Sequence, residues 1–262
     1  MRRGKITACA LCAAALLLAA PLSSAVEKDC HAVKRNVGGG RWQGLSPGLE
    51  VRDYRFLFTD ESFVRMTAVR VGLEVFRVRL RWLANSAPKV STAEALGQDV
   101  QIGVLANAGY FDENGRPLGF FLSGGKTYNR RLLFRGKKLA LHLGAVFSVR
   151  AGTEKVGIAT REEFDLGAEA EAFQAGPLLV RGGMPTAGLE SYREFRRPDR
   201  RTVIALERSG RLLVLVSEKT RGGISWCELQ VVLSRPESEG GLGVEAAMNL
   251  DGGRSSQLFI RS

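Results

Sequence analysis

Short strand-like runs separated by glycine-containing turns recur along this chain and constrain its fold more than any other feature. Apolar, β-branched and aromatic residues fill the runs, and 31 glycines supply turns and close backbone approaches. The clearest alternation is Glu74–Leu83, which places three arginines on one face, either as a solvated sheet face or as a wall for an anionic polymer. The other predicted strands are Tyr54–Phe58, Phe63–Val71, Ile102–Ala106, Arg131–Phe134, Ala145–Val149, Val156–Ala159, Leu178–Arg181, Thr202–Glu207, Leu212–Ser217 and Ala246–Leu250.

Helical signals are fewer. Capping boxes at Ser91–Glu94 and Ser225–Glu228 each predict a short helix, the second ending before Pro236. Because strands outnumber helices and do not alternate with them regularly, we predict an α+β fold, with a single domain built on a mixed β-sheet core and a few helices.

The first 25 residues have the three zones of a secretory signal. A basic start precedes the apolar stretch Ile6–Ala20, and small residues lead to Ala25. The apolar stretch is shorter than the about 20 residues that a membrane-spanning helix needs, although an uncleaved anchor is the alternative. We predict cleavage after Ala25, no stable membrane span afterwards, and export, most simply to the periplasm. Residues 26–90 then form the N-terminal segment and first strands of the same domain as 91–262.

The charge of the mature chain points to anionic partners. Loss of Arg2, Arg3 and Lys5 with the leader lowers the formal net charge from +11 to +8. An exported basic protein is expected to meet phosphorylated or anionic glycans and lipid head groups, and not nucleic acid. The alternative is that the charge serves only solubility. The sequence sets no oligomeric state.

Two cysteines, Cys30 and Cys227, remain after the leader is removed. An oxidising compartment favours a disulfide between them, and the long loop it closes would constrain the unfolded chain by about 4 kcal/mol.

Several common catalytic centres are poorly supported. The chain has two histidines, His31 and His142, and contains neither H-E-x-x-H nor G-x-S-x-G, which argues against a Ser-His-Asp triad or a histidine-rich zinc site. The segment Ser123–Thr127 resembles the end of a phosphate-binding loop, but its spacing is wrong, so we predict a turn.

Polar residues combine with glycine at three predicted strand ends, in segments 107–109, 174–177 and 249–253. Loops at strand ends commonly carry functional sites, and glycine lets backbone N–H groups approach an anionic ligand. Each segment alone is also explained as a tight turn. A fourth segment is rich in arginine, whose guanidinium matches phosphate, or is simply an exposed loop; its arginines are Arg193, Arg196, Arg197, Arg200 and Arg201.

The order of these motifs resembles the phosphodiester glycosidase family, which includes exported bacterial proteins linked to exopolysaccharides. The motifs are Asn107–Phe111, Pro117–Gly119, Gln174–Val180 with Gly182–Gly183, Arg201–Ala205 and Asn249–Ser256, and the resemblance covers about Ser91 to Ser262. Two positions depart from the family pattern, Ala108 where glycine is preferred and Tyr110 where phenylalanine is common. Because the tyrosine hydroxyl can alter what the pocket binds, the identity of the substrate is the expectation that these departures weaken most.

The resemblance implies a hydrolase that cleaves a sugar-1-phosphodiester, with the roles assigned as follows. Asp251 is the expected catalytic carboxylate, which stabilises an oxocarbenium-like state or activates water, with Asp112 as a second carboxylate. Arg201 is expected to hold phosphate together with Arg254, and a divalent cation near Asp251 is compatible with the sequence but not required by it. Asn107, Gln174 and Asn249 are expected to hold sugar hydroxyls or to orient Asp251. The other expected substrate-binding residues are Gly109, Gly176, Gly252, Gly253 and Ser255.

Two alternatives stay open at this point. One is a non-catalytic glycan-binding or polymer-assembly protein on the same fold, and the other is an envelope scaffold that holds anionic polymer on its arginine-rich faces.

Overall fold

A computed structural model describes residues 30, 33–38, 40–59, 61–82, 102–132, 143–218 and 222–261. The predicted leader, the helix predicted from Ser91 and both histidines lie outside these residues. In the described part of the chain, no helix is long and apolar enough to span a membrane.

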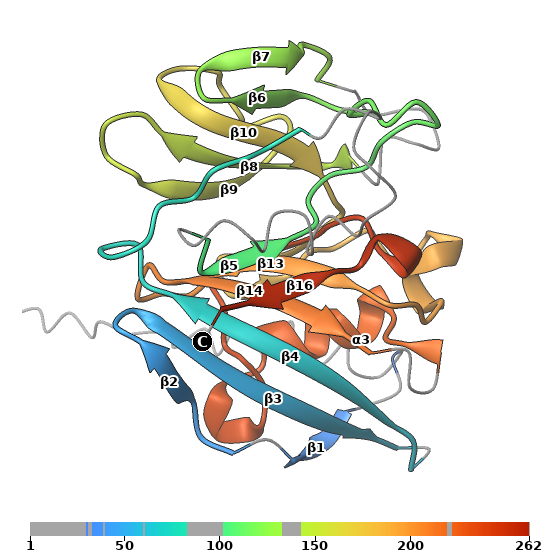
Figure 1. Cartoon of the computed structure of the whole chain (residues 1–262). Coiled ribbons are helices and arrows are strands. Elements are labelled where there is room, and N and C mark those ends of the chain that lie inside the picture. The colour runs from blue at the N-terminus through green and yellow to red at the C-terminus, as the bar shows by residue number, and fades with distance from the viewer. Residues whose placement is uncertain are drawn as a thin grey trace, which may run out of the picture.

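The strands form three sheets (Figure 1). The main sheet has the order β1-β3-β4-β14-β13-β15-β11-β12, with β2 beside β3. Its strands are β1 (Val33–Gly38), β2 (Gln43–Ser46), β3 (Leu49–Phe58), β4 (Phe63–Val71), β11 (Leu178–Arg181), β12 (Met184–Pro185), β13 (Thr202–Leu206), β14 (Leu212–Ser217) and β15 (Ala246–Asn249). The second sheet has the order β7-β6-β10-β8-β9, and β5 pairs with β16 in the third. Their strands are β5 (Val104–Ala106), β6 (Phe121–Ser123), β7 (Lys126–Asn129), β8 (Ala145–Arg150), β9 (Val156–Thr160), β10 (Glu169–Ala175) and β16 (Leu258–Ile260).

Strand pairing corrects one part of the predicted fold class. Every pairing among the described strands is antiparallel, so the expectation of a mixed sheet is wrong for them. Many neighbours, such as β3 and β4 or β13 and β14, are joined by short turns, which is the connection that antiparallel strands allow. The described residues are mostly β, with the α-helix α3 (Trp226–Ser234) and the short 3-10 helices η2 (Arg193–Arg196), η4 (Glu237–Glu239) and η5 (Gly253–Ser255).

The two faces of the main sheet pack against different partners. Val203 and Leu213 belong to a core shared with α3, whereas the neighbouring Ile204 and Leu212 belong to a core shared with the second sheet. This follows from the period of two in a strand, which sends successive side chains to opposite faces. Figure 1 shows the second sheet stacked over the main sheet, with β5 and β16 beneath it.

The helix predicted from the second capping box is confirmed. Ser225 is the N-cap of α3; its hydroxyl accepts from the Glu228 N–H, and the Glu228 carboxylate accepts from the Ser225 N–H. Eight of its nine residues are buried, so tertiary packing as well as the cap holds this short helix. A disulfide joins Cys227 at its start to Cys30, with Cα atoms 5.6 Å apart, and so ties the N-terminal segment to the helix.

The predicted strand Glu74–Leu83 is wrong. Residues 76–81 keep alternating burial, with arginines exposed and Val78 and Leu80 packed on the core, but they form no strand pairing. Polar groups of the second-sheet region replace the ladder: the Leu80 N–H donates to the Glu171 carboxylate at 3.2 Å, and the Leu80 carbonyl accepts from Ser123 Oγ at 2.6 Å. The alternation of apolar residues and arginines therefore correctly indicated a half-buried extended segment, but it did not show that the segment pairs with no other strand. The predicted strand at Arg131–Phe134 also fails where it is described, because Arg131 and Leu132 lie in no strand.

Candidate active site

Three polar residues from separate motifs, Asn107, Arg201 and Asp251, converge where β13 begins and β15 ends. Because β13 and β15 are antiparallel, with Val203 opposite Asn249, the Arg201 segment lies beside the loop that carries Asp251. Asn107 follows β5 directly and reaches the same loop.

The Asn107 side chain ties three segments together. Its Nδ2 donates to the Asp251 carbonyl at 2.7 Å. Its Oδ1 accepts from Thr202 Oγ1 at 2.8 Å and from the Gln257 N–H at 3.0 Å. These contacts occupy the amide, so Asn107 positions the Asp251 loop rather than presenting a free amide to a sugar.

Tyr110 and Asn249 form a second buried link. The Tyr110 hydroxyl is directed at the carbonyls of Gly176 (3.0 Å) and Leu250 (3.2 Å), and it accepts from Asn249 Nδ2 at 3.0 Å. Burial raises the pKa of Tyr110, and the charge of Asp251 raises it further. The hydroxyl that departs from the family pattern is therefore engaged within the protein.

Asp251 is a partly desolvated carboxylate. Burial raises its pKa above the ordinary value of 3.8, while hydrogen bonds from the Ser255 side chain and the Gly252 backbone oppose the shift. Its own N–H donates to the Ala108 carbonyl at 3.1 Å. The loop thus fixes the backbone of Asp251 while its carboxylate remains less well solvated than a surface aspartate.

Arg201 is buried and forms no ion pair among the described residues. It is 8% exposed, its guanidinium donates to the Ile224 carbonyl (3.2 Å) and the Arg197 carbonyl (2.9 Å), and its Cζ lies 5.1 Å from the Trp226 ring centroid. Burial lowers its pKa. Among the described residues no carboxylate forms an ion pair with the guanidinium, and Asp199 and Glu194 act on its charge only through space, which is unusual because buried charges are normally paired.

Glycines let the loops of this region pass close to other backbone. A Cβ on Gly252 would lie 2.7 Å from the Arg200 carbonyl oxygen, and one on Gly109 would lie 3.1 Å from the Gln174 carbonyl oxygen. The Gly253 N–H donates to the Arg200 carbonyl at 2.8 Å, and the residue has φ +58.

The remaining predicted site residues lie in different settings. Gln174 is buried, and its amide joins the Phe120 N–H (3.2 Å) to the Leu143 carbonyl (2.6 Å). The Asp112 carboxylate accepts from the N–H groups of Asn114 and Arg116, at 2.9 and 2.8 Å, and so closes its own turn. Arg254 is exposed on η5.

Asp199 lies at the site but was missed by the sequence analysis. Its Oδ1 accepts from the Arg200 N–H at 2.8 Å, and a Cβ on Gly253 would lie 3.7 Å from either carboxylate oxygen. The charge of Asp199 also acts on Arg201 and favours the charged guanidinium. The one indication of Asp199 in the sequence is its position two residues before Arg201, in the segment that was interpreted from its arginines alone.

Comparison with known proteins assigns the family. The profile of the phosphodiester glycosidase family matches residues 100–262, which include every one of these site residues. This chain belongs to the phosphodiester glycosidase family. The resemblance seen in the sequence motifs is thereby confirmed.

The individual proteins that this phosphodiester glycosidase family member resembles share little sequence identity with it. The uncharacterized protein YigE of Escherichia coli (strain K12) is 31% identical over 123 residues, which cover 45% of this chain and 48% of YigE, so the match spans about half of each. A hypothetical protein from Synechocystis superposes with a TM-score of 0.54 at 18% identity, covering 84% of this chain and 59% of that one. A putative exported protein from Burkholderia pseudomallei K96243 superposes with a TM-score of 0.50 at 12% identity, covering 76% and 70%. At these identities the two structures share the fold.

Proposed function

We propose that this chain is an exported hydrolase that cleaves the bond between a sugar's anomeric carbon and phosphate in a phosphodiester of a cell-envelope glycan or exopolysaccharide. The observation that carries the proposal is the buried Arg201, which has no ion-paired carboxylate among the described residues and lies beside the loop of the partly desolvated Asp251. A phosphodiester supplies the anion that Arg201 lacks and an anomeric carbon on which a carboxylate can act.

The reaction assigns one role to each charged group. As the bond from the anomeric carbon to the phosphate oxygen breaks, the electron pair leaves with the phosphate and the sugar gains oxocarbenium character. The Asp251 carboxylate stabilises that positive charge or takes a proton from the attacking water. Arg201, aided by Arg254 at the rim, offsets the charge that develops on the departing phosphate.

Asp199 takes the second-carboxylate role in this proposal in place of Asp112. Its carboxylate lies beside Gly253 in the Asp251 loop, whereas that of Asp112 is engaged by its own turn. Asn107 and Asn249 hold the backbone around Asp251, and Ser255 donates to its carboxylate. The proposal assigns the backbone at Gly109, Gly176, Gly252 and Gly253 to the substrate-binding surface.

The first test incubates the mature protein with an N-acetylglucosamine-1-phosphate diester, with and without a chelator. We expect sugar release that falls by about a thousandfold in Asp251→Asn. The matched control is Asp165→Asn, which makes the same change in an exposed loop and should leave the rate unaltered. Release by Asp251→Asn at the wild-type rate would overturn the catalytic assignment. The chelator arm tests a divalent cation; in the described residues no group of three or more His, Cys, Asp or Glu side chains is placed to hold one.

One observation favours a second candidate, a glycan-binding or polymer-assembly protein. The amides of Asn107 and Gln174 and the Nδ2 of Asn249 are engaged inside the protein, which leaves fewer groups to distinguish a substrate from a transition state. This candidate predicts that the diester binds to wild type and to Asp251→Asn alike, with no sugar released by either.

A further inference from the structure

Arginines are concentrated around the loop that carries Asp251. The segments 190–201 and 251–254 together contain six arginines against two aspartates and two glutamates. An excess of positive charge at a candidate active site favours an anionic substrate. The proposed function uses Arg201 and Arg254 on the scissile phosphate, and it gives no role to the guanidinium of Arg200.

Arg200 and Arg201 hold their guanidinium groups on opposite sides of one extended segment. An isolated antiparallel bridge precedes β13, so the chain between the two is extended, and successive side chains of an extended chain point to opposite sides. The contacts agree with this. Arg201 Nε donates to the Ile224 carbonyl, just before α3, at 3.2 Å, whereas Arg200 Nη2 donates to the Ser256 carbonyl, just after η5, at 3.0 Å. The two guanidinium groups are therefore placed to hold two anions rather than one.

Both arginines lie against the Asp251 loop. A Cβ on Gly252 would lie 2.7 Å from the Arg200 carbonyl oxygen and 3.8 Å from Arg201 Cδ. The Gly253 N–H also donates to the Arg200 carbonyl, at 2.8 Å. The two anion positions therefore flank the loop of the candidate catalytic carboxylate.

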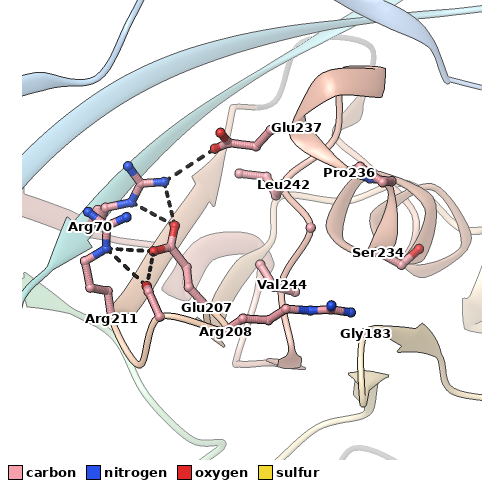
Figure 2. Close-up of a pocket in the computed structure, with 12 residues that line it drawn as sticks. Arg70, Gly183, Glu207, Arg208, Arg211, Ser234, Pro236, Glu237, Leu242 and Val244 are labelled. Atoms are coloured by element: carbon pink, nitrogen blue, oxygen red, sulfur yellow. Dashed lines mark hydrogen bonds and ion pairs between the residues drawn. The ribbon is translucent and has the colours of Figure 1, made fainter.

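The guanidinium of Arg200 is held in place but not neutralised. Arg200 is half-buried, and among the described residues its Nε and Nη1 have no partner and it forms no ion pair. The adjacent Asp199 accepts from the backbone N–H of Arg200 instead. Figure 2 shows the opposite arrangement beyond the other end of β13, where Arg70 and Arg211 are both bonded to Glu207. The charge of Arg200 is thus available to a ligand.

We propose that the substrate is a glycan of repeated sugar phosphodiesters, in which Arg200 holds the phosphate next to the scissile one. This assignment rests on the proposed function and names its substrate class. An exposed guanidinium gains little from a free phosphate, because water competes for both groups. A second phosphate that is linked to a bound one is held at high local concentration, so the same contact then adds to the affinity.

The test compares N-acetylglucosamine-1-phosphate oligomers that contain one and four diesters. We expect kcat/KM per diester to be about tenfold higher for the longer oligomer, and this length preference to fall below about threefold in Arg200→Gln. Arg200→Lys keeps the charge and should retain most of the preference. Arg208→Gln is the matched control, because Arg208 is also exposed but lies 3.4 Å from Glu245, beyond the other end of β13, and its loss should leave the preference unaltered.

Calorimetric titration of Asp251→Asn with the same oligomers separates the substrate class from the reaction. If wild type releases no sugar but the longer oligomer still binds about tenfold tighter per diester, the proposed reaction fails and the assignment of Arg200 stands. Equal affinity per diester for the two oligomers would overturn the assignment, as would equal losses of the preference in Arg208→Gln and Arg200→Gln. Arg200-dependent binding to phosphatidylglycerol vesicles without any length preference would also overturn it and would assign Arg200 to a lipid surface.

Discussion

The chain buries an arginine near each end of β13, and the two are in opposite electrostatic states. Beyond the far end of the strand, Arg70 is surrounded by Glu207, Glu237 and Glu50, with the closest oxygen at 2.6 Å. Before its start, Arg201 donates to two backbone carbonyls and has no carboxylate within 4 Å among the described residues. Carbonyl dipoles orient a guanidinium but do not neutralise it.

This difference indicates a structural role for the charge of Arg70 and supports the functional role proposed for the charge of Arg201. The charge of Arg70 is used within the fold, because it compensates Glu207, whose side chain is 11% exposed. The charge of Arg201 is buried without a direct ion pair. Such burial costs stability unless a ligand supplies the counter-charge. The comparison therefore supports the proposal of anion binding at the Arg201 end, whereas the charge of Arg70 is paired within the fold.

The largest predicted effect compares Arg70→Met with Arg201→Met. Removing Arg70 leaves Glu207 buried with part of its compensation gone, which should cost about 3 kcal/mol of unfolding free energy. Removing Arg201 also removes a buried charge that has no direct ion pair, so the loss of its hydrogen bonds should cost only about 1 kcal/mol. Urea denaturation of both variants measures the two values. Equal destabilisation would show that the two arginines do not differ as the contacts indicate.

Packing of the Asp251 loop gives the second effect. Gly252 has extended backbone that any residue adopts, but a Cβ there would lie 2.7 Å from the Arg200 carbonyl oxygen. Gly252→Ala should therefore cost about 2 kcal/mol through displacement of the loop and should also abolish sugar release. Gly44→Ala is the control, because a Cβ at Gly44 meets nothing within 4 Å. Wild-type stability and activity in Gly252→Ala would mean that the loop has room that the structure does not show.

Linkage to an anion gives the third effect. Inorganic phosphate at ten times its dissociation constant should stabilise the wild-type protein by about 1.4 kcal/mol, because it binds only the folded state. The gain should vanish in Arg201→Met and persist in Arg70→Met. Thermal unfolding at fixed ionic strength, with sodium chloride as the reference salt, measures it. Persistence in Arg201→Met would move the anion site elsewhere.

The sequence predicted local structure best where a local signal determines it. The bounds of β4, β11 and β14 match the predicted runs, and the Ser225 capping box fixed the start of α3. The strand β10 was missed, because Glu169–Ala175 is rich in glutamate and alanine, which have low strand propensity, and it becomes a strand only through pairing with β6 and β8.

The same division applies to the candidate site. Strand-end motifs indicated the segments 107–109 and 249–253, which do converge. They could not show that the amides of Asn107 and Gln174 would be used internally, because those partners lie 144 and 31 residues away in sequence. Nor could they separate Asp199 from Asp112, since that choice depends on which loop lies against Gly253.

The smallest predicted effect is the pH dependence of Asp251 itself. Because burial raises the pKa of Asp251 in the folded state above 3.8, the folded protein binds more protons than the unfolded one between the two values. The ionised carboxylate therefore lowers stability, increasingly as pH rises from 3.8 to the folded pKa and constantly above it. Asp251→Asn removes this penalty and should be slightly more stable than wild type at neutral pH, with the difference closing near pH 3. The effect is small because solvent still reaches the carboxylate.

Urea denaturation of wild type, Asp251→Asn and Asp165→Asn across this pH range measures that dependence. The exposed Asp165 variant should show no comparable pH-dependent gain. An Asp251→Asn protein that is less stable than wild type at neutral pH would mean that the Ser255 and Gly252 hydrogen bonds outweigh desolvation. Asp251 would then be a structural anion like Glu207, and the distinction between the two ends of β13 would rest on Arg201 alone.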